Sequence, residues 1–167
     1  MAWEAWVRMI HVLAAAIWLG GGLFAIAMVL PTVKAAGPAG KAFMMANLKR
    51  GGWGFFFGPA GGVTILAGLT LYAGLGYHKD PFGTTASILV TTGALLALAA
   101  FVEAMAVSMR AEKKMKTIVA AIGPSGPTPE QGAEMEKLAL RLAKAGMRTV
   151  TLLLLTMLLM LGRGLVS

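Results

Sequence analysis

The chain has 167 residues, of which 57% are hydrophobic and only 13% are charged. A soluble domain carries about twice that charged fraction, so the composition predicts a membrane protein with several spanning segments. The absence of cysteine excludes disulfides, thiolate nucleophiles, iron–sulfur clusters and cysteine-ligated metal sites. The net charge of +8 falls mainly in two connecting loops, which indicates topology signals facing anionic lipid and argues against nucleic acid as a partner.

Long apolar runs, without the alternation of barrel strands, predict an all-α fold. We expect a polytopic membrane protein that is one antiparallel bundle of four transmembrane helices, forming a single domain over residues 1–167. The expected helices cover about residues 6–30, 56–77, 84–122 and 129–163.

Proline, glycine and capping residues set the expected helix ends. Pro31 predicts the end of the first helix, and Gly123 predicts a stop after the third. The fourth helix opens with the capping box Thr128-Pro129-Glu130-Gln131, which places proline at the first helical position. Because the third and fourth helices carry charges outside their apolar parts, we expect them to project beyond the bilayer as an antiparallel hairpin.

The distribution of basic residues predicts the orientation. The loop after the first helix carries Lys34, Lys41, Lys49 and Arg50. The stretch from Arg110 to Lys144, which joins the apolar parts of the third and fourth helices, carries seven Lys and Arg residues. The short loop after the second helix carries Lys79 alone. Basic loops stay in the cytoplasm, so both termini are expected in the periplasm, as in a multi-pass protein of the inner (cytoplasmic) membrane.

His11 is the strongest candidate for function because it lies inside the first predicted span. An imidazole in hydrocarbon indicates a functional site by default, and imidazole is a common ligand of haem iron. The alternative is a structural hydrogen bond to a neighbouring carbonyl. At 100° per residue, the opposite face carries Leu13, Ile17 and Phe24. The face shared with His11 is mostly small, with one aromatic ring, and carries Ala14, Ala15, Trp18, Gly21, Gly22 and Ala25.

Three possibilities exist for the second axial position of a haem bound to His11. They are His78 in the outer loop, Met160 near the outer end of the fourth helix, and an open or water-filled position. The alternative for His78 is a solvated loop residue, and the alternative for Met160 is a packing residue. Arg8 and Arg163 lie on the same predicted side as His11, where they could bind the haem propionates or anchor the helices at lipid headgroups.

Glu103 and Arg148 form a second polar feature within apolar helices. The antiparallel third and fourth helices bring them to similar depths, so an ion pair is the economical interpretation. The functional alternative is a proton relay through Glu103. Trp18 and Gly22 are the remaining candidates for the cofactor slot, as walls beside His11.

The pattern Trp6-x4-His11-x6-Trp18-x-Gly20-Gly21 resembles the first helix of the CopD-like membrane proteins. It is also similar to the opening of the HemJ family of membrane protoporphyrinogen oxidases. The resemblance covers about 20 residues closely and the rest only in architecture. Both families are small helical membrane proteins, and the resemblance to the HemJ branch implies haem b held by His11.

The leading hypothesis is therefore a membrane cytochrome b in which the haem carries out redox or gas-ligand chemistry. Electron transfer with quinone, gas binding and porphyrinogen oxidation are all open, so enzymatic activity is undecided. The alternatives are a copper-handling transport component, with His11, His78 and Met160 as metal ligands, and a structural subunit without a cofactor. The glycine-rich helix faces also fit a homodimer.

Overall fold

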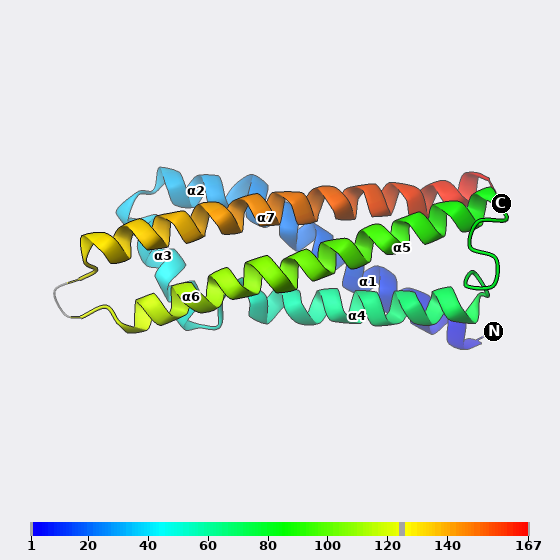
Figure 1. Ribbon diagram of the computed structural model, residues 1–167, viewed down its shortest axis with the longest axis horizontal. Coiled ribbons are helices and arrows are strands. Elements are labelled where there is room, and N and C mark those ends of the chain that lie inside the picture. The colour runs from blue at the N-terminus through cyan, green and yellow to red at the C-terminus, as the bar shows by residue number, and fades with distance from the viewer. Residues whose placement is uncertain (1, 124–125, 167) are drawn as a thin grey trace.

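The computed structural model describes residues 2–123 and 126–166. Its helices form an elongated antiparallel bundle in which both ends of the chain lie at the same end (Figure 1). All the long elements of the described residues are helical, which confirms the expected all-α class. Four of these helical stretches are long and apolar enough to cross a membrane, namely Trp3–Ala35, Gly52–Gly74, Thr85–Ala120 and Pro129–Leu165.

The first stretch is helical from α1 (Ala2–Phe24) through a π-helical segment η1 (Ala25–Val29) into α2 (Leu30–Ala35). The expected end at Pro31 is therefore wrong. In η1 the Leu30 N–H donates to the carbonyl of Ala25, five residues back, so the hydrogen-bond register changes just before the proline. Pro31 then lies in the first turn of α2, directly after this change of register, and the helix continues past it.

The remaining elements follow in chain order. They are α3 (Pro38–Lys49), α4 (Gly52–Gly74), α5 (Thr85–Glu103), a second π-helical segment η2 (Ala104–Ser108), α6 (Met109–Ala120), α7 (Pro129–Gly162) and the 3₁₀ turn η3 (Arg163–Leu165).

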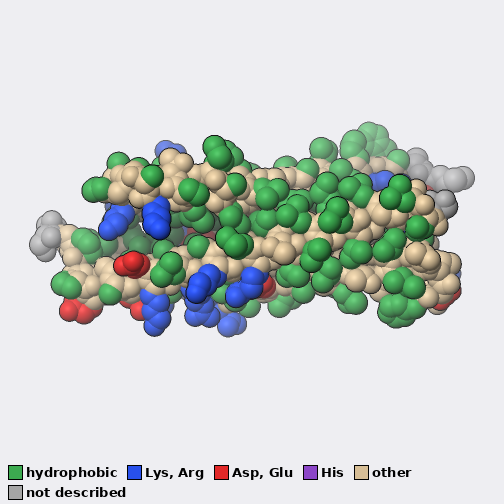
Figure 2. Space-filling model, turned by 90° about the horizontal axis from the view of Figure 1, so that it is seen from above, with side chains coloured by type: hydrophobic (Ala, Val, Ile, Leu, Met, Phe, Trp, Pro, Cys, Tyr) green, Lys and Arg blue, Asp and Glu red, His purple; other side chains and the backbone are tan. Residues whose placement is uncertain are grey.

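Helix α3 lies where the sequence suggested only a basic loop. It packs against α6, and Leu48 in its last turn is buried. A small core forms there from Leu48, Ala111, Met115, Val119 and Leu138. This core holds the α6–α7 hairpin and α3 together at the end of the bundle away from the termini, where Lys and Arg side chains gather on the surface (Figure 2).

The capping box of the fourth helix is confirmed. The Thr128 side chain accepts from the Gln131 N–H, and the Gln131 side chain accepts from the Thr128 N–H. At the other side of the turn, α6 ends at Ala120, three residues before the expected stop at Gly123. Residues 124–125 of this turn lie outside the described part of the chain.

Helix α1 packs mainly on α4, and α5 packs on α7. The predicted division of α1 into two faces is confirmed, because Ala14 and Trp18 are buried while Leu13, Ile17 and Phe24 are largely exposed. Many other large apolar side chains also point outward from the four long helices. Such a surface suits contact with lipid chains.

Candidate functional site: the His11 cavity

The His11 ring lies between α1 and α4. Its Nδ1 is 2.9 Å from the backbone carbonyl oxygen of Thr64, a buried residue of α4. The Thr64 hydroxyl donates to the carbonyl of Ala60, so it does not compete for the imidazole. Gly68, one turn further along α4, lies against the ring: a Cβ there would come within 2.9 Å of His11 Cε1. The glycine thus makes room for the imidazole.

This contact fixes the tautomer of a neutral His11. A carbonyl oxygen only accepts, so Nδ1 must carry the proton and donate to Thr64. The lone pair then resides on Nε2. Metal-binding histidines commonly donate their second nitrogen to a backbone carbonyl in this way, which fixes the ring orientation and raises the basicity of the ligating nitrogen.

His11 lines a cavity of about 560 Å³, hereafter the His11 cavity. This volume lies within the usual range of small-molecule and cofactor sites, about 300–1,000 Å³. The walls are largely apolar and come from α1, α4, α5 and α7. The structure brings five of the predicted site residues to this one cavity, namely Arg8, His11, Trp18, Met160 and Arg163.

Arg163, Tyr72 and Tyr77 line the His11 cavity at the end of the bundle near the termini. The Arg163 guanidinium carbon lies 5.6 Å from the ring centroid of Tyr77, which stacks on Tyr72 at 6.0 Å. The Tyr72 hydroxyl is 3.0 Å from the Thr91 hydroxyl, which donates in turn to the carbonyl of Pro81. Arg163 is therefore held by an aromatic pair whose inner ring is fixed by hydrogen bonds. Such a cation suits an anionic group in the cavity.

Two predicted site residues lie elsewhere. His78 is exposed in the loop after α4 and does not line the His11 cavity. Gly22 lines a second, smaller cavity, where a Cβ would fall 2.9 Å from Val150 Cγ2. Met160 does line the His11 cavity, and its Cε packs close to Gly93 of α5. Among the described residues, no group of three or more His, Cys, Asp or Glu side chains is placed to hold a metal ion.

The predicted ion pair is confirmed. Arg148 Nε donates to Glu103 Oε1 at 2.5 Å and joins α7 to the end of α5. The Glu103 side chain is 19% exposed and that of Arg148 is 60% exposed, so the pair lies at the edge of the bundle. A structural role for Glu103 thus has a direct observation behind it. Its role as a proton relay stays a prediction.

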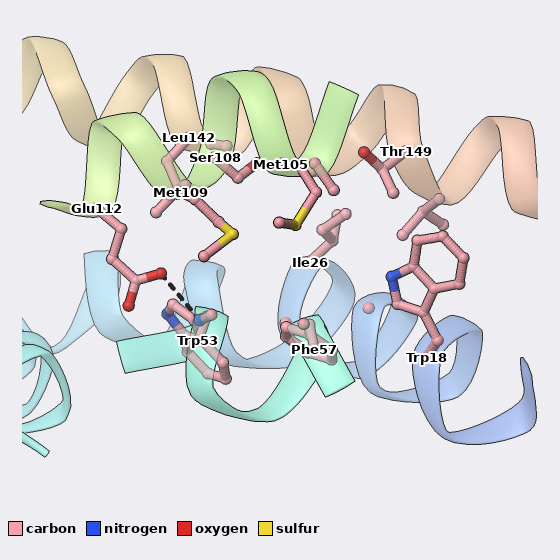
Figure 3. A pocket seen from close by; sticks show the side chains of 18 of the residues that line it. Trp18, Ile26, Trp53, Phe57, Met105, Ser108, Met109, Glu112, Leu142 and Thr149 are labelled. Atoms are coloured by element: carbon pink, nitrogen blue, oxygen red, sulfur yellow. Dashed lines mark hydrogen bonds between the residues drawn. The ribbon is translucent and has the colours of Figure 1, made fainter. Parts of the chain in front are cut away.

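Glu112 was not among the residues predicted from the sequence. This side chain is only 5% exposed, and its Oε2 accepts from the Gly54 N–H at 2.9 Å, in the first turn of α4 (Figure 3). It lies over Gly52, where a Cβ would fall 1.3 Å from Oε1. Lys116 Nζ is 3.5 Å from Oε1 and donates to the carbonyl of Gly51 at 2.6 Å. A carboxylate and an ammonium of α6 therefore anchor the start of α4.

Glu112 also lines the second cavity, hereafter the Glu112 cavity, which has a volume of about 160 Å³. The signal for this site in the sequence was weak. Glu112 belongs to a run of charges typical of a solvated helix, and its partner Gly54 is 58 residues away. Trp18 lines both cavities and is 4% exposed, with Phe101 packed edge-on at 6.0 Å.

No family model, curated protein or solved structure matches this chain.

Proposed function

We propose that this chain is a multi-pass inner-membrane protein that binds haem b in the His11 cavity, with His11 Nε2 as the axial ligand. The observation that carries the proposal is the hydrogen bond from His11 Nδ1 to the Thr64 carbonyl. It holds the imidazole in the tautomer that ligates metal, beside a largely apolar space of cofactor size. Both termini would face the periplasm, as the basic residues of the opposite end suggest.

The residues of the His11 cavity fit a haem in three respects. His11 supplies one imidazole, and the macrocycle itself supplies the other in-plane nitrogen ligands, so no cluster of protein ligands is required. Apolar side chains would cover the porphyrin faces. Arg8 and Arg163, both lining the cavity, would pair with the two propionates near the membrane surface.

Bound haem would supply one-electron transfer or the binding of a small gas ligand. The chain's own contribution is to orient the imidazole through Thr64, to keep water from the apolar walls and to neutralise the propionates. Met160 lines the same cavity and would be the candidate for a second protein ligand of the iron. His78, exposed in its loop, is not part of this proposal.

Purification after expression in a haem-producing host tests the proposal. The wild-type protein should show a Soret band and a haem b pyridine haemochromogen spectrum. The variant His11→Ala should insert into the membrane and lose most of its haem, whereas the matched variant His78→Ala should keep it. A colourless wild-type protein, or a His11→Ala variant with full occupancy, would refute the assignment, and a colourless protein that retains copper would favour the copper-handling alternative.

A further inference from the structure

The Glu112 cavity has the size of a site for one aromatic ring. Its volume of about 160 Å³ is close to that of an engineered apolar cavity, about 150 Å³, that binds benzene. Trp53 and Phe57 of α4 line it from one side, with Trp18 at one end (Figure 3). Met105 and Met109 face them from the third long helix. Aromatic faces and polarizable thioethers together favour an aromatic occupant.

Both π-helical segments of the chain contribute to this cavity. Ala25 and Ile26 of η1 line it, as do Ala104, Met105 and Ser108 of η2. π-Helical turns occur frequently at functional sites, because they re-aim side chains at the expense of regular helical hydrogen bonding. Two of them from different helices surround one small cavity here.

Two buried polar side chains on this cavity retain unused hydrogen-bonding capacity. Glu112 Oε1 and Thr149 Oγ1 are both buried and have no hydrogen-bond partner among the described residues. An ionised carboxylate only accepts hydrogen bonds, so the partner that Glu112 lacks is a donor. Lys116 Nζ, 3.5 Å from Oε1, balances the carboxylate charge and also donates to the Gly51 carbonyl. Because the charge is balanced, the carboxylate suits a neutral ligand with a donor, and no cation is needed.

We propose that the Glu112 cavity binds the head group of a phenol or hydroquinone, a single ring whose hydroxyl donates to the Glu112 carboxylate. The ring packs among the aromatic and methionine side chains. Membrane quinols belong to this chemical class. The proposal requires no haem and goes beyond the proposed function, although Trp18 and Leu153 line both this cavity and the His11 cavity.

Three probe ligands of nearly equal shape separate the hydrogen bond from apolar packing. Duroquinol carries two hydroxyl donors, duroquinone only carbonyl acceptors, and durene neither. Binding to the full chain in nanodiscs is measured by calorimetry, anaerobically and against empty nanodiscs. The wild type should bind duroquinol about 10- to 100-fold more tightly than durene, the factor expected for one hydrogen bond to a charged group. Equal affinities would overturn the proposal.

The variant Glu112→Gln is the decisive comparison. Its amide oxygen can still accept from the Gly54 N–H, while its amide nitrogen is a donor in place of the free acceptor. Duroquinol affinity should fall to about the level of durene, and duroquinone should become the better of the two redox forms. The control Glu134→Gln, which breaks surface ion pairs with Lys114 and Lys137 on the α6–α7 hairpin, should leave all three affinities unchanged. Unchanged selectivity in Glu112→Gln would overturn the proposal.

A second variant guards against a change of shape in Glu112→Gln. Ala143 lines the same cavity, and Ala143→Phe fills the space while leaving Glu112 in place. This variant should retain its helical content and lose binding of both duroquinol and durene. Retained duroquinol binding in a folded Ala143→Phe protein would place the ring elsewhere and contradict the proposal, whatever the result for Glu112→Gln.

Discussion

Replacing Arg148 with leucine should destabilise the bundle by leaving the Glu103 carboxylate without its partner. An exposed ion pair contributes about 0.2–1 kcal/mol, and removing one member of a buried pair costs about 3–5 kcal/mol. Here one side chain is 19% exposed and the other is 60% exposed. We therefore expect a loss of about 1–2 kcal/mol, between these limits and discounted for the exposed guanidinium. Replacing both residues with leucine should recover much of it.

A double-mutant cycle measures this coupling in the free energy of unfolding, followed by circular dichroism in mixed detergent micelles. Independent sites add within about 0.3–0.5 kcal/mol, so a coupling of about 1 kcal/mol between Glu103→Leu and Arg148→Leu would be resolved. Arg141→Leu, on the same helix and away from Glu103, is the matched control and should show no coupling. Additive losses for the pair would refute the energetic role of this contact.

Two glycine substitutions and one fusion give further predictions. Gly52→Ala should destabilise the protein by about 1–3 kcal/mol in thermal unfolding, because its Cβ would displace the Glu112 carboxylate. The control Gly51→Ala, also at positive φ but clear of the carboxylate, should destabilise the protein less. Equal losses in the two variants would show that backbone strain alone acts. Gly68→Ala should lower haem occupancy in pyridine haemochromogen assays by pushing the His11 ring away, and full occupancy would mean that the ring position does not matter. Alkaline phosphatase, which is active only in the periplasm, should be active when fused to the C-terminus. An inactive phosphatase fusion, together with a fluorescent C-terminal fusion to a reporter that fluoresces only in the cytoplasm, would show the opposite orientation.

Hydropathy and helix geometry predicted much of the fold. The four apolar stretches dominate the sequence, and the capping box at Thr128 marks a helix start by local chemistry alone. The ion pair between Glu103 and Arg148 was predictable because antiparallel neighbours with a short connection fix relative depth. The buried face of α1 followed from a 3.6-residue period, since His11 and Trp18 are seven residues apart.

The features that the sequence did not predict depend on contacts between distant segments. Glu112 is buried because α4 begins beside it, and nothing within α6 itself indicates this. The change of register in η1 overrode the usual helix-ending effect of Pro31. Helix α3 is stabilised by packing of Leu48 against α6, whereas its own composition resembles a basic loop. The partner of His11 is a backbone carbonyl, and because every residue type has one, the sequence could not identify it.

Histidine-selective ¹⁵N labelling gives the most direct test of His11 as a haem ligand, because the chain contains only two histidines. In the His78→Ala variant, His11 is the single labelled residue. Pulsed electron paramagnetic resonance of the ferric protein should then show strong hyperfine coupling from its ligating ¹⁵N. A ferric haem signal without ¹⁵N coupling, or a protein that binds no haem, would contradict axial ligation by His11.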